Sequence, residues 1–238
     1  MSRRFAELDA VDTSMGTISL RRRLEPSRKV DVYEVKLGDE FLMSSLFTVA
    51  EIELARLGLA ALDTPSDASL DVVVGGLGLG YTALAALEDP RVGQLTVVEA
   101  LPEVIAWHER ELLPDTVGLA ADPRVELRAG DFFALTAGDG YDPATPGRRH
   151  DAILVDIDHT PTHHLADAHA GFYTVDGLRH LRRHLVAGGV FALWSDRAFE
   201  ASFLDTVREA FDEVVAHEVR FANFLTGGTS ANSVLVAR

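Results

Sequence analysis

Cysteine is absent from the 238 residues of this sequence. Its absence excludes disulfide bonds, thiolate metal sites and a cysteine nucleophile. The sequence also lacks an apolar run long enough to span a membrane. Its opening stretch, MSRRFAELDAVD, is charged and does not have the apolar core of a signal peptide. We therefore expect a cytoplasmic protein with no membrane partner.

Basic residues are scarce in comparison with acidic ones. The chain has 22 Lys and Arg against 37 Asp and Glu, which gives a formal net charge of -15. A surface of this sign repels phosphate backbones, so we expect no nucleic-acid partner. The same charge attracts cationic small molecules, although it also serves ordinary solubility.

The N-terminal part of the chain has the pattern of a small β unit. Short strand-like runs are followed by a stretch with helical spacing and by a linker rich in turn formers. The strands are expected at 17–24, 30–38 and 40–45, the helix at 48–62 and the linker at 64–69. We predict a small N-terminal β segment plus helix over residues 1–62 and a larger domain over residues 63–238.

Strands and helices alternate through the larger domain. This order predicts a parallel sheet that is covered by helices on both faces. Two strands in direct succession close the chain and predict an antiparallel hairpin at one edge. The strands are expected at 70–76, 94–100, 124–130, 151–157, 189–195, 213–221 and 232–238, and the helices at 81–87, 103–113, 175–186 and 199–211. The pattern indicates an α/β fold with a Rossmann-like, seven-stranded sheet.

The sequence VVVGGLGLG at residues 72–80 places a glycine-rich turn between the first of these strands and the next helix. Glycines allow tight turns and let a ligand approach the backbone closely. The N-terminus of the following helix adds N–H groups and positive potential, at the strand end where open α/β sheets bind ligands. The turn predicts a cofactor site at Gly75, Gly76, Gly78 and Gly80, although a purely structural turn has the same pattern.

Acidic residues follow the next two strands of the predicted sheet. Glu99 is placed to accept hydrogen bonds from a ribose diol. Asp131 is placed to accept from the exocyclic amine of adenine, and a helix N-cap is its alternative role. The expected neighbours of the purine ring are Ala100, Leu101 and Phe132.

These three strand ends together resemble the nucleoside site of class I S-adenosylmethionine-dependent methyltransferases. That family has a seven-stranded sheet with a reversed last strand, so the resemblance implies the same fold here. A nicotinamide-dependent oxidoreductase is the competing interpretation. It is disfavoured because the spacing within GGLGLG departs from G-x-G-x-x-G and because Asp131 would then have no role.

Within that fold the chain is most similar to spermidine synthases, along nearly its full length. VVVGGLGLG stands where they have a GGGDGG turn, DIDHTP (156–161) where they have D-S-S-D-P, and FANFLTGG (221–228) where they have P-T-Y-P-S-G. The N-terminal strands resemble their small β-domain, which pairs subunits, and this implies that the chain can form a homodimer.

Three departures from the spermidine synthases bear on the reaction. Gly78 stands where they have the Asp that holds the amine of decarboxylated S-adenosylmethionine, and Phe224 replaces the loop Tyr that touches polyamine. Their second catalytic Asp is replaced by His159 or Thr160. An Asp in the turn would repel the carboxylate of ordinary S-adenosylmethionine, whereas a Gly-Leu turn with free N–H groups tolerates it. We therefore predict S-adenosylmethionine as the cofactor and methyl transfer to a small amine or hydroxyl acceptor.

Two alternatives to methyl transfer stay open. The first is a polyamine aminopropyltransferase that uses decarboxylated S-adenosylmethionine, which the overall acidity and the pair Asp156 and Asp158 favour. The second is a non-catalytic homologue that binds a nucleoside, against which the intact Asp156 argues.

The candidate bases for the acceptor proton are Asp156, Asp158 and His159. Asp156 ends the strand beside the glycine turn, where it also borders the expected cofactor, and strand alternation points Asp158 the same way if the strand continues. The candidates for the acceptor pocket are Tyr173, Trp194 and Phe224, with core packing as the alternative for the first two. Histidines cluster in this region, but no acid or histidine pairs cleanly with them, so we predict no metal site.

Overall fold

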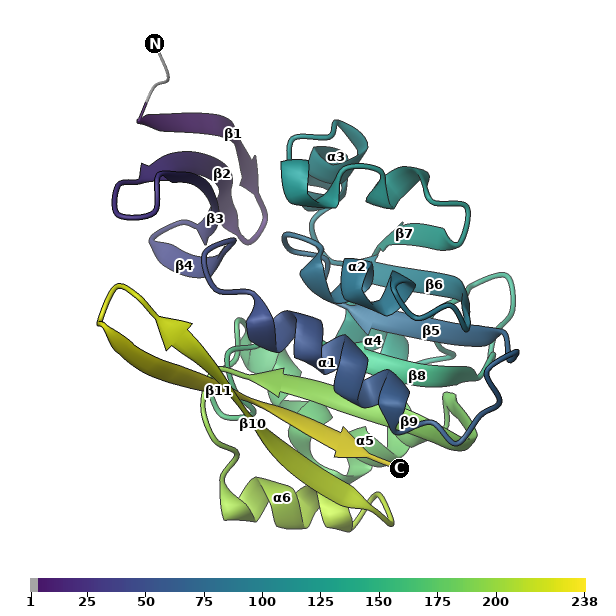
Figure 1. The fold of residues 1–238 in the computed structure, drawn as a ribbon. Coiled ribbons are helices and arrows are strands. Elements are labelled where there is room, and N and C mark those ends of the chain that lie inside the picture. The colour runs from purple at the N-terminus through teal and green to yellow at the C-terminus, as the bar shows by residue number, and fades with distance from the viewer. Residues whose placement is uncertain (1–3) are drawn as a thin grey trace.

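The computed structural model describes residues 4–238, so the first three residues of the charged opening stretch lie outside it. The described chain forms a four-stranded sheet followed by a seven-stranded sheet with helices (Figure 1). Among residues 4–238, every helix is too short or too polar to cross a bilayer.

The N-terminal sheet is an antiparallel meander of β1 (Phe5–Thr13), β2 (Gly16–Glu25), β3 (Val30–Leu37) and β4 (Glu40–Ser44). The last three strands were expected from the sequence, and β1 was not. No residue of β1 is fully buried, because this strand lies at the edge of the sheet. An edge strand of this kind has little of the hydrophobic alternation by which strands are found.

The larger sheet has the predicted seven strands, and its strand order is β10-β11-β9-β8-β5-β6-β7. Five strands run parallel, and β11 joins β9 and β10 in antiparallel pairs, as the closing hairpin predicts. The parallel strands are β5 (Leu70–Gly75), β6 (Val92–Glu99), β7 (Val125–Ala129), β8 (His150–Val155) and β9 (Leu185–Ser195), and the hairpin strands are β10 (Val214–Asn223) and β11 (Gly228–Ala237).

Helices cover both faces of this sheet, because successive strand residues point to opposite sides. Val72 and Val74 of β5 pack in one hydrophobic cluster, together with side chains of α1 (Val49–Ala60), α2 (Tyr81–Leu87) and α3 (Pro102–Glu109). Val73 packs in the other, with α4 (Phe132–Ala137), α5 (Val175–Arg182) and α6 (Ala201–Arg208). The expected helices have their counterparts here, and α4 was missed because six residues are too few to show a helical period.

The N-terminal sheet stands beside the carboxyl ends of the parallel strands (Figure 1). Helix α1 leads from β4 onto the larger sheet, where it packs against α2 and β9. The chain's division at residues 62 and 63 stays a prediction.

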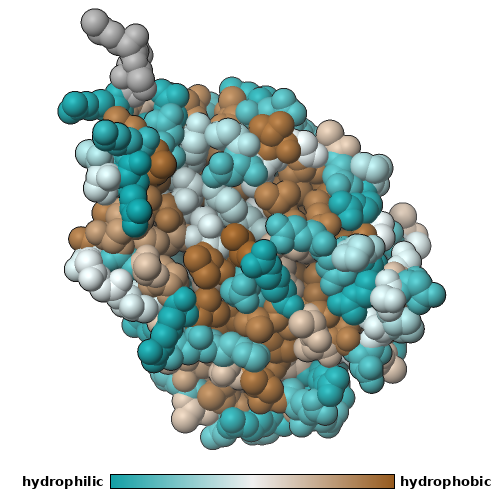
Figure 2. Space-filling view, viewed as in Figure 1, coloured by the Kyte–Doolittle hydropathy of each residue, from teal (hydrophilic) through white to brown (hydrophobic). Residues whose placement is uncertain are grey.

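Hydrophobic and hydrophilic residues are intermixed on the face seen in Figure 2, and hydrophobic side chains gather near its middle. The large hydrophobic side chains that are exposed include Phe41 of β4, Val49 of α1 and Val215 of β10. They come from separate elements, as is ordinary for a folded chain.

Candidate active site

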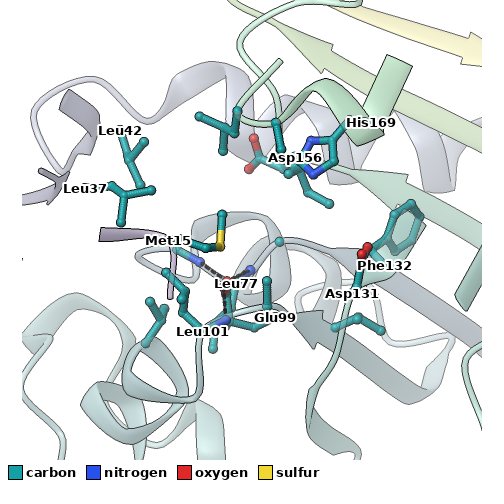
Figure 3. A pocket seen from close by; sticks show the side chains of 18 of the residues that line it. Met15, Leu37, Leu42, Leu77, Glu99, Leu101, Asp131, Phe132, Asp156 and His169 are labelled. Carbon is teal, nitrogen blue, oxygen red and sulfur yellow. Dashed lines mark hydrogen bonds between the residues drawn. The ribbon is translucent and has the colours of Figure 1, made fainter. Parts of the chain in front are cut away.

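A cavity of about 490 Å³ lies at the carboxyl ends of the parallel strands (Figure 3). One wall comes from the loops that follow β5, β6, β7 and β8, which is where open α/β sheets bind ligands. The opposite wall comes from the N-terminal sheet and is apolar. Its residues are Met15, Ile18, Val35, Leu37, Leu42 and Met43.

The glycine turn lies at this cavity, but only its middle part lines it. Gly76, Leu77 and Gly78 are lining residues, whereas Gly75 and Gly80 are not. A Cβ atom on Gly75 would lie 2.7 Å from the ring of Phe132, and one on Gly80 would lie 2.7 Å from His108. Packing inside the protein therefore accounts for these two glycines.

The two glycines that line the cavity have positive φ angles, 92° at Gly76 and 47° at Gly78. A Cβ on Gly76 would lie 2.2 Å from the backbone oxygen of Asp156. One on Gly78 would lie 2.3 Å from the sulfur of Met43. The turn therefore requires glycine both for its conformation and for the close approach of its neighbours.

The expectation that this turn has free N–H groups is wrong at three positions. Glu99 Oε2 accepts hydrogen bonds from the backbone N–H of Leu77, at 3.0 Å, and of Gly78, at 3.4 Å (Figure 3). The N–H of Leu79 points to Met43 Sδ at 3.2 Å. A ligand carboxylate would have to compete with these partners.

Glu99 is held at the end of β6 by backbone donors. Besides the turn, Leu101 N–H donates to its Oε1 at 3.0 Å. Burial raises the pKa of Glu99, and these hydrogen bonds oppose the rise because they favour the ionised carboxyl. Oε2 accepts two of these hydrogen bonds and Oε1 accepts one, so a lone pair of Oε1 can still accept from a hydroxyl in the cavity.

The predicted purine end of the site contains Asp131 and its neighbours. Asp131 Oδ1 caps α4, because it accepts from the N–H groups of Phe133, at 2.9 Å, and Ala134, at 3.1 Å. The helix N-cap, which was the alternative role predicted for Asp131, is thus present. Asp131 also lines the cavity, together with Ala100, Leu101 and Phe132.

Asp156 and Glu51 bring two carboxyl groups to the same cavity. The backbone N–H of Asp156 donates to Gly75 O at 2.9 Å, because β8 pairs with β5 as predicted. Thr82 Oγ1 of α2 donates to Asp156 Oδ2 at 2.7 Å. Burial raises the pKa of Asp156 to about 6, and the Thr82 hydrogen bond opposes this rise.

Glu51 was missed in the sequence, although a signal was present. It lies on the same face of α1 as the buried residues Leu54, Ala55 and Gly58, at helical spacing. An acid on an otherwise apolar helix face is unusual and points to a special environment. Burial and the nearby charge of Asp156 raise the pKa of Glu51 to about 8.

The structure does not bring Asp158 or Tyr173 into the cavity, since neither is a lining residue. The strand ends at Val155, so alternation does not carry on to Asp158. Asp158 is 2% exposed and accepts from Tyr173 Oη at 2.9 Å and from the Leu165 N–H at 2.7 Å. His169 Nδ1 lies 2.8 Å from the same carboxyl group. This acid organises the loop instead of facing Asp156.

The other predicted residues divide between the cavity and a different surface. His159 lines the cavity, with its Nε2 3.3 Å from Glu40 Oε1 of β4. Trp194 of β9 also lines it. Phe224 does not, and its ring packs on Phe47 and under the guanidinium of Arg28.

Sequence reasoning missed one aromatic contact beside the purine end. His169 lines the cavity and stacks on Phe133, with 4.0 Å between the ring centroids. Among residues 4–238, no three His, Asp or Glu side chains are grouped so that they could hold a metal ion.

No protein-family model matches this sequence. A polyamine aminopropyltransferase of Corynebacterium efficiens is 40% identical over 88 residues, a match that covers 36% of this chain and 15% of that protein. The chain therefore aligns with less than a fifth of this curated relative.

Solved structures that match this fold cover most of the chain. A spermidine synthase in complex with the transition-state analogue AdoDATO has a TM-score of 0.72 and 16% identity, over 97% of this chain and 73% of that one. Human methyltransferase-like protein 13 in complex with SAH has a TM-score of 0.59 and 21% identity, over 79% of this chain and 82% of that one. The chain thus has the spermidine synthase-like form of the class I methyltransferase fold, as the motifs predict.

Proposed function

We propose that this protein transfers an alkyl group from an adenosyl sulfonium to a small amine, and that the aminopropyl group of decarboxylated S-adenosylmethionine is the group transferred. The observation that carries this proposal is the charge of the cavity. Among residues 4–238, its titratable lining consists of four carboxyl groups and two histidines: Glu51, Glu99, Asp131, Asp156, His159 and His169.

This lining favours a cofactor without a carboxylate. Ordinary S-adenosylmethionine would place its carboxylate among these acids, next to a turn whose N–H groups already have partners. A buried like charge without a counterion costs several kcal/mol by order of magnitude. The preference for methyl transfer that the sequence suggested rested on Gly78, on Phe224 and on free N–H groups in this turn. Because these N–H groups have partners, we now favour aminopropyl transfer.

The residues of the cavity fit the nucleoside part of such a cofactor. Glu99 supplies carboxylate oxygens for the ribose hydroxyls, and Asp131 supplies an acceptor for the adenine amine. Leu101 and Phe132 give apolar surface at the purine end. These roles are those expected from the sequence for the three strand ends.

Asp156 is the candidate base at the reacting end of the cavity. When bound, a sulfonium supplies a carbon that is already activated for displacement, so the protein mainly orients the amine and removes its proton. Asp156 is half-buried beside the glycine turn and has one oxygen held by Thr82, which leaves the other for the acceptor. His159, in the loop that follows β8, is the second candidate.

Methyl transfer from S-adenosylmethionine is the second candidate function. It is favoured by Gly78, which stands where spermidine synthases have an acid, and by the likeness to a methyltransferase-like protein in complex with SAH. A homologue that binds a nucleoside without turnover is the third.

Ligand binding separates these candidates, because a ligand that prefers the folded state raises its stability. We expect methylthioadenosine to bind at least about tenfold more tightly than S-adenosylhomocysteine, which corresponds to about 1.4 kcal/mol. Thermal shift and calorimetry measure both. Mass spectrometry with decarboxylated S-adenosylmethionine and a panel of small amines then identifies the transferred group.

The opposite order of affinity would overturn aminopropyl transfer and support methyl transfer. Binding of both nucleosides without modification of any amine would support the third candidate. An Asp176→Asn variant, in which an exposed acid of α5 is replaced, is the control for unspecific effects of charge.

A further inference from the structure

Glu51 enters the cavity from an element that contributes no other lining residue. It lies in the first turn of α1 and lines the cavity. Among residues 4–238, no other residue makes a hydrogen bond or ion pair with its carboxyl group. The group is thus positioned by the packing of α1, and its oxygens are available to a ligand.

Asp156 is the acidic neighbour of Glu51 in this cavity. Thr82 lies between their elements, since its Oγ1 is 2.7 Å from Asp156 Oδ2 and 3.2 Å from the backbone oxygen of Glu51. Thr82 is 3% exposed, so the contact is shielded from water. The two carboxyl groups therefore lie where α1, α2 and the end of β8 come together.

Two carboxyl groups in this setting cannot both ionise at low cost. Burial acts on both, and the charge of Asp156 further raises the pKa of Glu51. The other titratable groups that line the cavity are Glu99, Asp131, His159 and His169, and Tyr81 of α2 also interacts with the charge of Glu51. None of these groups carries a permanent positive charge, so the pair has no fixed counterion in the described chain.

Trp194 adds an aromatic side chain to the same cavity. Trp194 lines the cavity and packs against the same hydrophobic cluster as Leu54 and Ala55 of α1. Its indole Nε1 is buried and has no hydrogen-bond partner among the described residues. A cavity that contains both an aromatic side chain and carboxyl groups suits an ammonium group.

We propose that Glu51 and Asp156 form a carboxyl pair that holds one proton between them in the empty cavity, binds a primary ammonium group of the acceptor, and releases that proton to solvent on binding. Before binding, one carboxyl is neutral and one is ionised. After binding, both are ionised around the cation. The inference deepens the proposed function and rests on it for the cationic acceptor. It assigns the second acid to α1, because Asp158 is already engaged by Tyr173 and His169.

The first test measures stability against pH, without any ligand. A raised pKa of Glu51 in the folded state means that its contribution is complete below about pH 5 and is lost as the pH rises towards about pH 8. Glu51→Gln removes this loss. We expect the Tm of Glu51→Gln to match the wild type near pH 5 and to exceed it by about 2–4 °C near pH 8.

Two further variants keep this test decisive. Asp156→Asn removes the neighbouring charge, so the pH dependence that remains from Glu51 becomes smaller. Glu53→Gln is the matched control, because Glu53 lies on the same helix outside the cavity and pairs with Arg56. The inference of a carboxyl pair would be overturned if the change in Tm of Glu51→Gln did not depend on pH, or if it equalled the change in Glu53→Gln.

The second test uses 1,4-diaminobutane as the cationic probe and 1,4-butanediol as its uncharged counterpart. We expect the diamine to raise the Tm of the wild type and of Glu53→Gln, but not of Glu51→Gln, and the diol to raise none. Calorimetry in two buffers of different ionisation enthalpy should show release of up to one proton near neutral pH. No rise in the wild type, or the same rise in Glu51→Gln, contradicts the inference.

These tests involve no transfer reaction, so the two proposals fail separately. Suppose that the protein modifies an amine, but that Glu51→Gln keeps the wild-type pH dependence and the diamine response. This result overturns only the inference of a carboxyl pair. Suppose instead that Glu51→Gln loses both the pH dependence and the diamine response, but that the protein modifies no amine. This result overturns only the proposed function.

Discussion

The proposed chemistry depends most on one residue, Asp156. It lies beside the glycine turn, its backbone is fixed by pairing with Gly75, and Thr82 holds one of its oxygens. We predict that Asp156→Asn lowers the rate of transfer by about 10²–10⁴-fold, as expected for loss of a general base. The affinity for methylthioadenosine should change much less than the rate, because Glu99 and Asp131 supply the proposed hydrogen bonds to the nucleoside. Single-turnover kinetics and calorimetry measure the two quantities, and full retention of the rate would remove the assignment.

The hydroxyl of Thr82 affects the pKa of Asp156. Its hydrogen bond favours the ionised form of Asp156, so its removal in Thr82→Val raises the pKa of that carboxyl further. A base is active when it is ionised. We therefore predict that the rising limb of the pH profile of kcat/KM moves to higher pH, by about one unit. Thr206→Val, on the exposed side of α6, is the control. A lower rate with an unshifted limb would mean that Thr82 acts only through packing.

At the scale of elements, the sequence predicts the frame of the site well. The helix expected at 81–87 is α2 with the same bounds, and the glycine turn lies at a strand end as expected. The sequence of each segment is enough to predict these two features, because the φ angles of a turn and the hydrophobic periodicity of a helix depend on the residues of the segment itself.

Contacts between distant segments explain what the sequence did not reveal. The partners of the turn are Glu99 of β6 and Met43 of β4, and neither can be assigned before the sheets are assembled. Asp158 was expected beside Asp156, but the strand stops first and Asp158 turns towards Tyr173. Glu51 is different, since its place on an apolar helix face was visible in the sequence.

The contact between β4 and the glycine turn gives a prediction for these two elements. At Gly78, a φ of 47° and a Cβ position 2.3 Å from Met43 Sδ both disfavour a side chain. Gly78→Ala should destabilise the fold by about 2–4 kcal/mol, from backbone strain and overpacking together. Met43→Ala should relieve the overpacking part, so the double variant should be more stable than the sum of the single effects by about 1 kcal/mol. Urea unfolding measures this cycle, and additive values would show that Met43 adapts freely.

At the scale of the whole molecule, both sheets are needed to make the cavity. The larger sheet supplies the acids at its strand ends, and the N-terminal sheet supplies an apolar wall with Ile18, Leu37 and Leu42. His159 and Glu40 approach each other across the gap between them. A ligand in this cavity therefore touches both parts, and the N-terminal segment belongs to the site whether or not it also forms the predicted homodimer.

The net charge of -15 acts on every ligand that approaches this cavity. A field of this sign attracts a cationic amine and is screened when salt shortens the Debye length from about 30 Å at 0.01 M to about 3 Å at 1 M. We predict that the association rate of a diamine falls by about tenfold or more over this range, whereas that of methylthioadenosine, which is uncharged, changes little. Stopped-flow measurements over a salt series compare the two ligands on the same protein. If the diamine rate does not depend on salt, the acidic surface serves solubility alone and the selection of a cation rests entirely on the carboxyl groups inside the cavity.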